Sequence, residues 1–233
     1  MTGHVTHEPP LRFKVCGLTR LADCRLAESL GAAYLGFIFA RSPRRCSAEW
    51  AEALVRGLDA DASSAAAPRR ARRVGVFDLQ APATVGAVAR RVGLDVVQLH
   101  GPADARRLAE LRTLTSAELW SVVAVAGSCV DERALEVAQG ADGILLDAKI
   151  GSRVGGTGVP FDWERVARTL EPLRPSRPII LAGGLTATNV VTAAAILRPD
   201  VVDVSSGVES RPGRKDPARL RAFAHAVRGV VAA

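Results

Sequence analysis

The sequence predicts a single (β/α)₈ barrel of the α/β class, and three observations support this prediction. Eight short β-branched or apolar runs are each followed by a polar or Gly-containing turn and then by an amphipathic stretch. The chemically distinctive residues come directly after the runs, and barrels of this kind carry their active sites at the C-terminal ends of the strands. The chain has 233 residues, close to the ~250 that one such domain takes.

The apolar runs predict eight strands, which is the number that this closed parallel barrel needs. Val96-Val97-Gln98-Leu99 is apolar almost throughout, as is typical of strands covered on both faces. In chain order, the expected strands are Arg12 to Cys16, Tyr34 to Phe39, Arg73 to Phe77, Asp95 to His100, Leu119 to Val125, Gly143 to Asp147, Pro178 to Ala182 and Val201 to Ser205.

The stretches between these runs have helical spacing and enough length for crossover helices. We expect residues 1–11 to form a flexible tail, residues 12–233 to form one catalytic barrel domain, and the Ala-, Ser-, Asp- and Arg-rich stretch from Asp59 to Arg73 to be an irregular loop. The helical spacing is clearest at Leu21, Leu26 and Leu30, at Val85, Val88, Ala89 and Val92, and at Leu108, Leu111 and Leu114.

Composition indicates a soluble, cytoplasmic protein that binds neither membrane nor nucleic acid. No apolar run reaches the ~18 residues of a membrane span, and no signal-peptide core is present. The net charge of +7 comes mostly from dispersed arginines, and the dense cluster from Arg69 to Arg73 lacks interleaved aromatic residues for base stacking. A basic active-site mouth for an anionic substrate explains part of the excess equally well.

The four cysteines lack the spacing of a metal site, and a cytoplasmic chain is not expected to form disulfides. Cys24 in a helical pattern and Cys129 in a turn are expected to be packing residues. Cys16 ends the first strand, where a thiolate could meet a substrate at the barrel mouth. Its position alone leaves catalysis and packing equally open.

Two Gly-rich turns predict a phosphate site. Gly183-Gly184 follows the seventh strand and Ser205-Ser206-Gly207 follows the eighth, and this pair of loops commonly binds phosphate in such barrels. Glycine allows backbone N–H groups to approach the oxygens closely, and a following helix N-terminus favours the anion.

The sixth strand ends in Asp147 and leads into a long loop that contains Gly155-Gly156-Thr157-Gly158. The loop is either a mobile segment that closes over substrate or a plain surface loop. Asp147 is either a turn or capping residue or a catalytic acid, and its neighbour Lys149 could pair with it.

Eight ordered motifs together resemble the family of phosphoribosylanthranilate isomerases. The resemblance spans roughly Lys14 to Asp216. The motifs are Lys14-Val15-Cys16-Gly17-Leu18-Thr19, Gly36-Phe37-Ile38-Phe39 with Ser42-Pro43-Arg44, Val74-Gly75-Val76-Phe77, Val97-Gln98-Leu99-His100-Gly101, Leu145-Leu146-Asp147-Ala148-Lys149, Gly155-Gly156-Thr157-Gly158 with Phe161-Asp162-Trp163, Leu181-Ala182-Gly183-Gly184-Leu185 and Val202-Asp203-Val204-Ser205-Ser206-Gly207-Val208-Glu209.

The resemblance implies an isomerase of tryptophan biosynthesis that carries out an Amadori rearrangement of N-(5-phosphoribosyl)anthranilate. By the family pattern, Cys16 is the general base and Asp147 the general acid, and neither a cofactor nor a metal is required. Protonation of the furanose oxygen opens the ring to an iminium ion, which acidifies the C2 proton that a thiolate then removes.

The same resemblance places four further residues against the substrate. Arg44 would bind the anthranilate carboxylate, although it could be an ordinary loop arginine, and the Phe39 to Ser42 loop is shorter than in many members. Gln98 and His100 would line the pocket, or form a buried polar pair inside the barrel. Asp203 would project near the substrate, or serve an internal hydrogen bond.

Two other functions are compatible with parts of this pattern. Other phosphate-binding barrels, such as the tryptophan synthase α subunit, indole-3-glycerol-phosphate synthase or an isomerase of histidine biosynthesis, use carboxylate or Lys catalysts and would not need Cys16. A catalytically silent barrel that binds a phosphorylated ligand or nucleic acid would show no turnover and salt-sensitive binding.

Overall fold

The computed structural model describes residues 10–61, 70–101, 104–126, 129–148, 166–168 and 177–230. Most of the expected N-terminal tail, Lys149 and the loop with Gly155 to Gly158 therefore lie outside the described residues.

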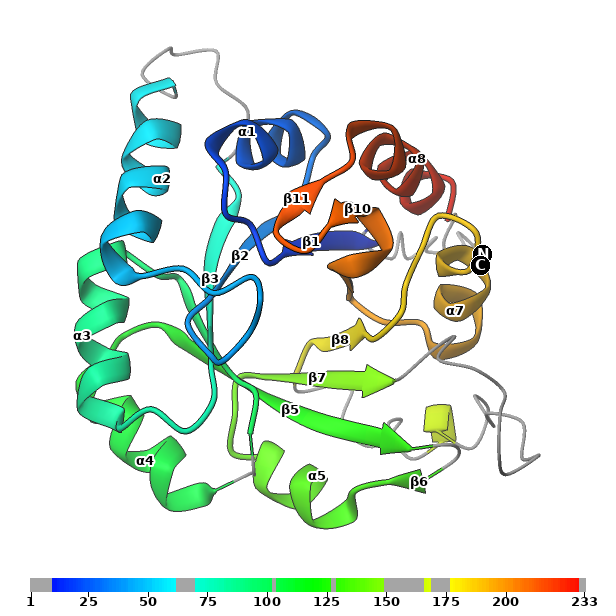
Figure 1. Ribbon diagram of the computed structural model, residues 1–233. Helices are drawn as coiled ribbons and strands as arrows, with labels where there is room; N and C mark the ends of the chain where they lie inside the picture. Colours follow the sequence, from blue (N-terminus) through cyan, green and yellow to red (C-terminus); the bar gives the residue numbers. More distant parts are fainter. Residues whose placement is uncertain are drawn as a thin grey trace, which may run out of the picture.

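Eight parallel strands close into a barrel, which confirms the predicted fold (Figure 1). The order around the barrel is β4-β3-β2-β1-β9-β8-β7-β5, and pairing of β4 with β5 closes it. The strands are β1 (Arg12–Cys16), β2 (Tyr34–Ile38), β3 (Arg72–Phe77), β4 (Val96–Leu99), β5 (Glu118–Ala126), β7 (Gly143–Ala148), β8 (Ile179–Ala182) and β9 (Val201–Val204).

Helices cover the outside of the barrel, as Figure 1 shows. They include α1 (Leu21–Ser29), α2 (Ala48–Asp61), α3 (Pro82–Val92), α4 (Ala105–Leu114), α5 (Glu132–Ala138), α7 (Val190–Leu197) and α8 (Pro217–Arg228). Between β9 and α8 lie a 3₁₀ turn, η2 (Ser206–Val208), and the hairpin of β10 (Glu209–Arg211) and β11 (Arg214–Lys215).

Local sequence signals explain where several helices begin. Asp104 and Asp131 accept backbone N–H bonds at the N-termini of α4 and α5. Asp216 does the same for α8, whose first residue is Pro217. These caps satisfy N–H groups that have no partner inside the helix.

Two details of the sequence prediction are wrong. The stretch from Asp59 to Arg73 is not one irregular loop, because α2 continues to Asp61 and β3 begins at Arg72. Cys129 lies in a two-residue strand, β6 (Cys129–Val130), which pairs with β5. The helix expected from Leu21, Leu26 and Leu30 is confirmed as α1, in which these leucines are partly buried against the core while Asp23, Cys24 and Ala27 are fully buried. Tertiary packing decides which side of so short a helix faces the strands.

The core has two layers because side chains alternate along each strand. Val96, Trp120, Leu145, Ile180 and Val201 belong to the smaller cluster, inside the barrel. Their neighbours along the strands belong to the larger cluster, which lies between barrel and helices. A residue two positions beyond an interior residue therefore also points inward, at the C-terminal mouth.

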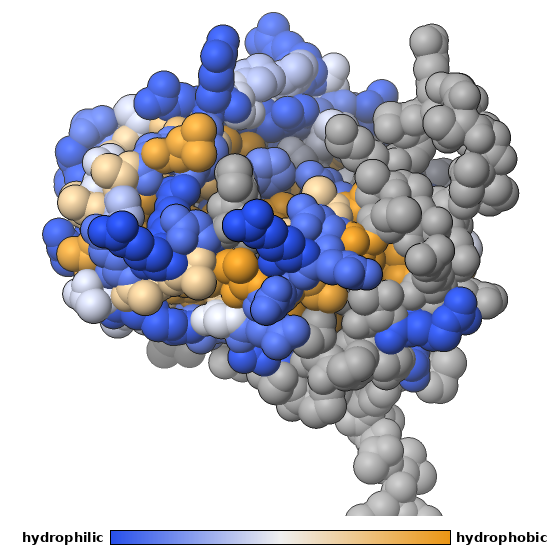
Figure 2. Space-filling model, turned by 90° about the horizontal axis from the view of Figure 1, so that it is seen from below, coloured by the Kyte–Doolittle hydropathy of each residue, from blue (hydrophilic) through white to orange (hydrophobic). Residues whose placement is uncertain are grey.

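None of the described helices is long and apolar enough to cross a membrane. On the face drawn in Figure 2, hydrophilic side chains are interspersed with small apolar patches.

Candidate active site

A cavity of about 340 Å³ lies at the C-terminal ends of the barrel strands. A larger hollow of about 520 Å³ lies between α3 and α4, near the start of β4, and contains none of the candidate residues. The candidates that line the cavity at the strand ends are Cys16, Arg44, Gln98, His100, Asp147, Gly183, Gly184, Asp203, Ser206 and Gly207. The structure therefore brings together every residue that the sequence analysis placed at the site.

Cys16 is the last residue of β1 and points into the barrel with only 7% of its surface exposed. The absence of a side chain at Gly36, on the neighbouring strand β2, makes room for the Cys16 thiol, because a Cβ there would lie 3.0 Å from the Cys16 Sγ. Burial raises the pKa of the Cys16 thiol, and the positive charges of Lys14 and Lys215 oppose this effect. Burial therefore favours the neutral thiol, while two cations are placed to stabilise the thiolate.

Lys14 and Asp203 form a buried ion pair beside Cys16. The Lys14 Nζ lies 2.7 Å from the Asp203 Oδ2, and Lys14 is fully buried. Burial lowers the pKa of Lys14, but the charges of Asp203 and Cys16 more than offset this, so its pKa is raised. Among the described residues, the Asp203 Oδ1 has no hydrogen-bond partner, and Asp203 lines the cavity. Asp203 thus offers a buried acceptor to a ligand hydroxyl.

Asp147 lies at the end of β7, two residues beyond the interior residue Leu145. It is half-buried, and it is paired in register with Ala182 of β8. Strands β9 and β8 separate β1 from β7, so Cys16 and Asp147 face the cavity from different sides of its wall. An acid and a base on different sides of one cavity can act on two atoms of one bound molecule.

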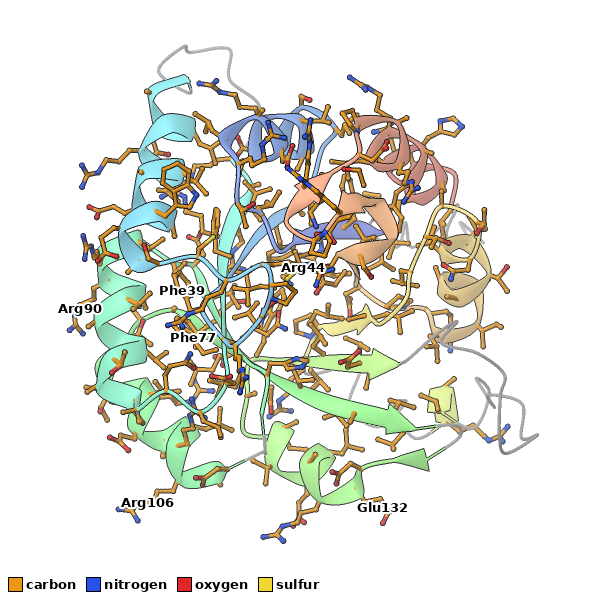
Figure 3. All side chains as sticks on the ribbon, viewed as in Figure 1. Phe39, Arg44, Phe77, Arg90, Arg106 and Glu132 are labelled. Carbon is orange, nitrogen blue, oxygen red and sulfur yellow. The ribbon has the colours of Figure 1, made fainter. Side chains whose placement is uncertain are left out.

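Arg44, labelled in Figure 3, reaches the cavity from the loop after β2. Glu209 holds it there by an ion pair. The Arg44 Nε and Nη2 donate to the Glu209 carboxylate, with an Nη2 to Oε2 distance of 2.7 Å. Gly17, at φ 75°, allows this packing, because a Cβ there would lie 2.6 Å from the Arg44 Cδ. Glu209 occupies the Nε edge of the guanidinium, which leaves the Nη1 and Nη2 edge for a ligand carboxylate.

Gln98 and His100 both line the cavity from the end of β4, but they are not a buried polar pair. Gln98 is buried, whereas His100 is exposed. The Gln98 Oε1 is buried and has no hydrogen-bond partner within the described part of the chain. Its position inside the wall makes it a second acceptor available to a ligand.

The two Gly-rich turns meet at the same end of the cavity. Gly183 and Gly184 have φ of 99° and 63°, which an L side chain adopts only with strain. A Cβ on Gly207 would lie 1.9 Å from the Leu185 carbonyl oxygen, so only glycine lets η2 pack against the turn after β8. Backbone N–H groups at the start of η2, from Ser206 onward, can then face an anion.

Three residues at the site were not predicted from the sequence: Lys14, Glu209 and Lys215. The available signal was compositional, because only three of the 31 Lys and Arg residues are lysines. Two of those three lie fully or almost fully buried around Cys16. Within the described residues, no group of three or more His, Cys, Asp and Glu side chains is placed to hold a metal ion.

Comparison with known proteins identifies the family. The sequence model described as N-(5'phosphoribosyl)anthranilate (PRA) isomerase matches residues 13–226. The chain belongs to this family. A curated family relative from Pseudomonas fluorescens is 38% identical over 221 residues, covering 94% of this chain and 97% of the relative. Another N-(5'-phosphoribosyl)anthranilate isomerase, from Geobacter sulfurreducens, is 39% identical and covers 94% of this chain and 99% of the relative.

Solved structures of the isomerase family have the same fold. The phosphoribosyl anthranilate isomerase of Thermotoga maritima is 34% identical, with a TM-score of 0.76, and covers 94% of this chain and 99% of its own. A second isomerase structure, in complex with reduced 1-(o-carboxyphenylamino)-1-deoxyribulose 5-phosphate, is 32% identical with a TM-score of 0.74 and the same coverage. The predicted enzyme class, an isomerase of tryptophan biosynthesis, is confirmed by this membership.

Proposed function

We propose that the chain converts N-(5'-phosphoribosyl)anthranilate to 1-(o-carboxyphenylamino)-1-deoxyribulose 5-phosphate, with Cys16 as general base and Asp147 as general acid. The observation that carries this proposal is that both residues line one cavity together with the two Gly-rich turns at Gly183-Gly184 and Ser206-Gly207. The product is the unreduced form of the molecule bound in the 32% identical family structure.

Asp147 begins the reaction by donating its proton to the furanose ring oxygen. The bond between C1 and the ring oxygen breaks, and the anilino nitrogen supplies its lone pair to form an iminium ion. The ring oxygen keeps the proton as a hydroxyl group. The half-buried position of Asp147 at the mouth puts its carboxyl within the cavity without removing it from solvent.

Cys16 then removes the proton from C2 as a thiolate. The electrons of the C2–H bond form a C1–C2 double bond, and the iminium nitrogen recovers its lone pair. The resulting enol tautomerises to the ketone when C1 gains a proton and the C2 hydroxyl loses one. Atoms and electrons balance without an external reductant or oxidant, and the Lys14 ammonium stabilises the thiolate.

The two ends of the substrate have matching partners. The turns at Gly184 and Gly207 would bind the phosphate with backbone N–H groups, and the free edge of Arg44 would bind the anthranilate carboxylate. Asp203 and Gln98 each have a buried oxygen without a partner among the described residues, and these oxygens would accept bonds from the sugar hydroxyls. We place the enzyme in the cytoplasm, where a soluble biosynthetic intermediate is available.

The test is a coupled assay with freshly generated N-(5'-phosphoribosyl)anthranilate, together with rescue of a tryptophan auxotroph that lacks this step. Turnover by the unchanged protein and loss of rescue by Cys16→Ser are expected. Absence of turnover by folded protein would reject the activity. A second phosphate-binding barrel activity, with a carboxylate or Lys catalyst, would instead leave Cys16→Ser fully active.

A further inference from the structure

The hairpin that follows η2 carries two buried charged residues that do not line the cavity. Glu209 of β10 and Lys215 of β11 are directly opposite each other in the hairpin register. The Lys215 Nζ lies 2.9 Å from the Glu209 Oε1. This cross-strand pair lies immediately behind the wall that carries Cys16 and the phosphate turn.

Lys215 donates all three of its ammonium bonds to acceptors in this region. Its Nζ lies 2.6 Å from the Cys16 carbonyl oxygen and 3.2 Å from the Ser205 carbonyl oxygen, in addition to Glu209. The side chain is fully buried. A buried ammonium is costly unless it is paired and fully hydrogen-bonded, and here three acceptors match three donors.

The three acceptors belong to three parts of the proposed site. The Cys16 carbonyl ends β1 and carries the proposed base. The Ser205 carbonyl lies between the end of β9 at Val204 and η2, the proposed phosphate turn. Glu209 holds the guanidinium of Arg44. One ammonium therefore links the base, the phosphate turn and the proposed carboxylate-binding arginine.

The hairpin itself is anchored from behind, so the ammonium cannot move freely. The Lys215 backbone N–H donates to the Asp23 carboxylate of α1 at 3.0 Å. The Thr19 hydroxyl donates to the Gly213 carbonyl at 2.5 Å. The Arg219 guanidinium of α8 donates to the Glu209 carbonyl at 2.6 Å. These bonds fix the hairpin to both α1 and α8.

The chemistry of the position calls for lysine in a chain that otherwise uses arginine. A guanidinium is planar and carries five N–H donors, whereas an ammonium is a compact point charge with three. Three acceptors around one point suit the ammonium and would leave two guanidinium donors without a partner. The use of a lysine, one of only three in the chain, follows this requirement.

We propose that Lys215 is a positioning residue of the isomerase, which holds Cys16, the phosphate turn and the Glu209–Arg44 pair in their working arrangement. This inference rests on the proposed roles of those groups. Lys215 touches no substrate atom and acts through its three acceptors. The positive charge of Lys215 also favours the Cys16 thiolate, as do the charges of Lys14 on β1 and of Arg44. The negative charge of Asp203 on β9 disfavours the thiolate.

The first test compares Lys215→Met and Lys215→Arg with the control Arg214→Met, which removes a cation from the exposed side of the same strand. We expect kcat/KM to fall by about 10²-fold in Lys215→Met, because a small displacement of a reacting group greatly reduces the rate of the chemical step. Lys215→Arg should keep the charge without restoring activity. The kcat/KM of the Arg214→Met control should stay within about twofold of the value for the unchanged enzyme.

The second readout does not need turnover. Iodoacetamide alkylation of Cys16, followed by peptide mass spectrometry across pH, reports the thiolate fraction. We expect the alkylation midpoint to move to higher pH in Lys215→Met and to stay in place in Arg214→Met. A purely structural lysine would not move this midpoint. If the unchanged protein proves inactive, the proposed function fails, while the alkylation midpoint still tests the contact with Cys16.

A folded Lys215→Met protein with unchanged kcat/KM and an unchanged alkylation midpoint would overturn the inference. If this variant does not fold, the isosteric Glu209→Gln carries the test, because it weakens the hold on Lys215 and Arg44 together. A rise in KM of about tenfold or more then supports the inference, on the scale of one lost charged hydrogen bond. An unchanged KM overturns it.

Discussion

The buried pair of Lys14 and Asp203 should give two single variants whose stabilities respond to pH in opposite directions. In Lys14→Met, a carboxylate remains in the barrel without the ammonium 2.7 Å away. In Asp203→Asn, the ammonium remains alone. Lys14 is 0% exposed and Asp203 7%, so the charge that remains is largely shielded from bulk solvent. Removing one member of such a pair costs about 3–5 kcal/mol of unfolding free energy near neutral pH.

The direction of each pH dependence follows from the groups that remain. Burial raises the pKa of Asp203, and Lys14 is the main opposing charge. Without Lys14, the folded protein keeps a proton that the unfolded chain releases above about pH 4, so the stability of Lys14→Met falls as pH rises. Burial lowers the pKa of Lys14, and without Asp203 this effect dominates. The unfolded chain then binds the extra proton, so the stability of Asp203→Asn rises with pH up to about pH 10.

The assay is urea unfolding followed by circular dichroism at pH 6 and pH 8.5. With a slope of about 3 kcal/mol/M, a loss of 3–5 kcal/mol lowers the midpoint by about 1 to 1.7 M. The double variant Lys14→Met/Asp203→Asn is the control, because it leaves no buried charge at this position and should recover part of the loss. Two single variants with the same pH trend, or with losses below about 1 kcal/mol, would refute a buried charged pair.

Three further predictions concern the proposed reaction. Cys16→Ser should lower kcat/KM by about 10²-fold or more. It should also remove the rise of kcat/KM with pH that reports deprotonation of the Cys16 thiol, whose pKa burial raises above the usual value of about 8.5. A folded variant with normal steady-state kinetics would show that Cys16 only packs. Asp147→Asn should lose a similar factor, because the amide has no carboxylic proton to donate to the ring oxygen, whereas full activity in the folded variant would assign the acid to another group. Gly207→Ala should weaken binding of inorganic phosphate about tenfold or more by calorimetry, because its Cβ would lie 1.9 Å from the Leu185 oxygen; equal affinity would remove the phosphate turn from the site.

Local sequence determined the elements of the fold. The continuous apolar runs predicted all eight barrel strands to within a residue or two, because strands covered on both faces need such runs. The position of Cys16, Asp147 and the Gly-rich turns directly after those runs was enough to predict where they meet. In a parallel barrel, every strand end of this kind lies at the same mouth.

The charged contacts around that mouth were decided by the tertiary structure alone. Lys14 and Asp203 are 189 positions apart, and Arg44 and Glu209 are 165 positions apart. Sequence periodicity shows that Lys14 and Cys16 share a face of one strand, but it does not show which distant carboxylate closes on the lysine. That choice depends on the stagger of the strands when β4 meets β5 and on how the hairpin with Lys215 packs behind the wall that carries Cys16. These are properties of the closed barrel, because a buried charge finds its partner only when the whole ring of strands brings the two within hydrogen-bond distance.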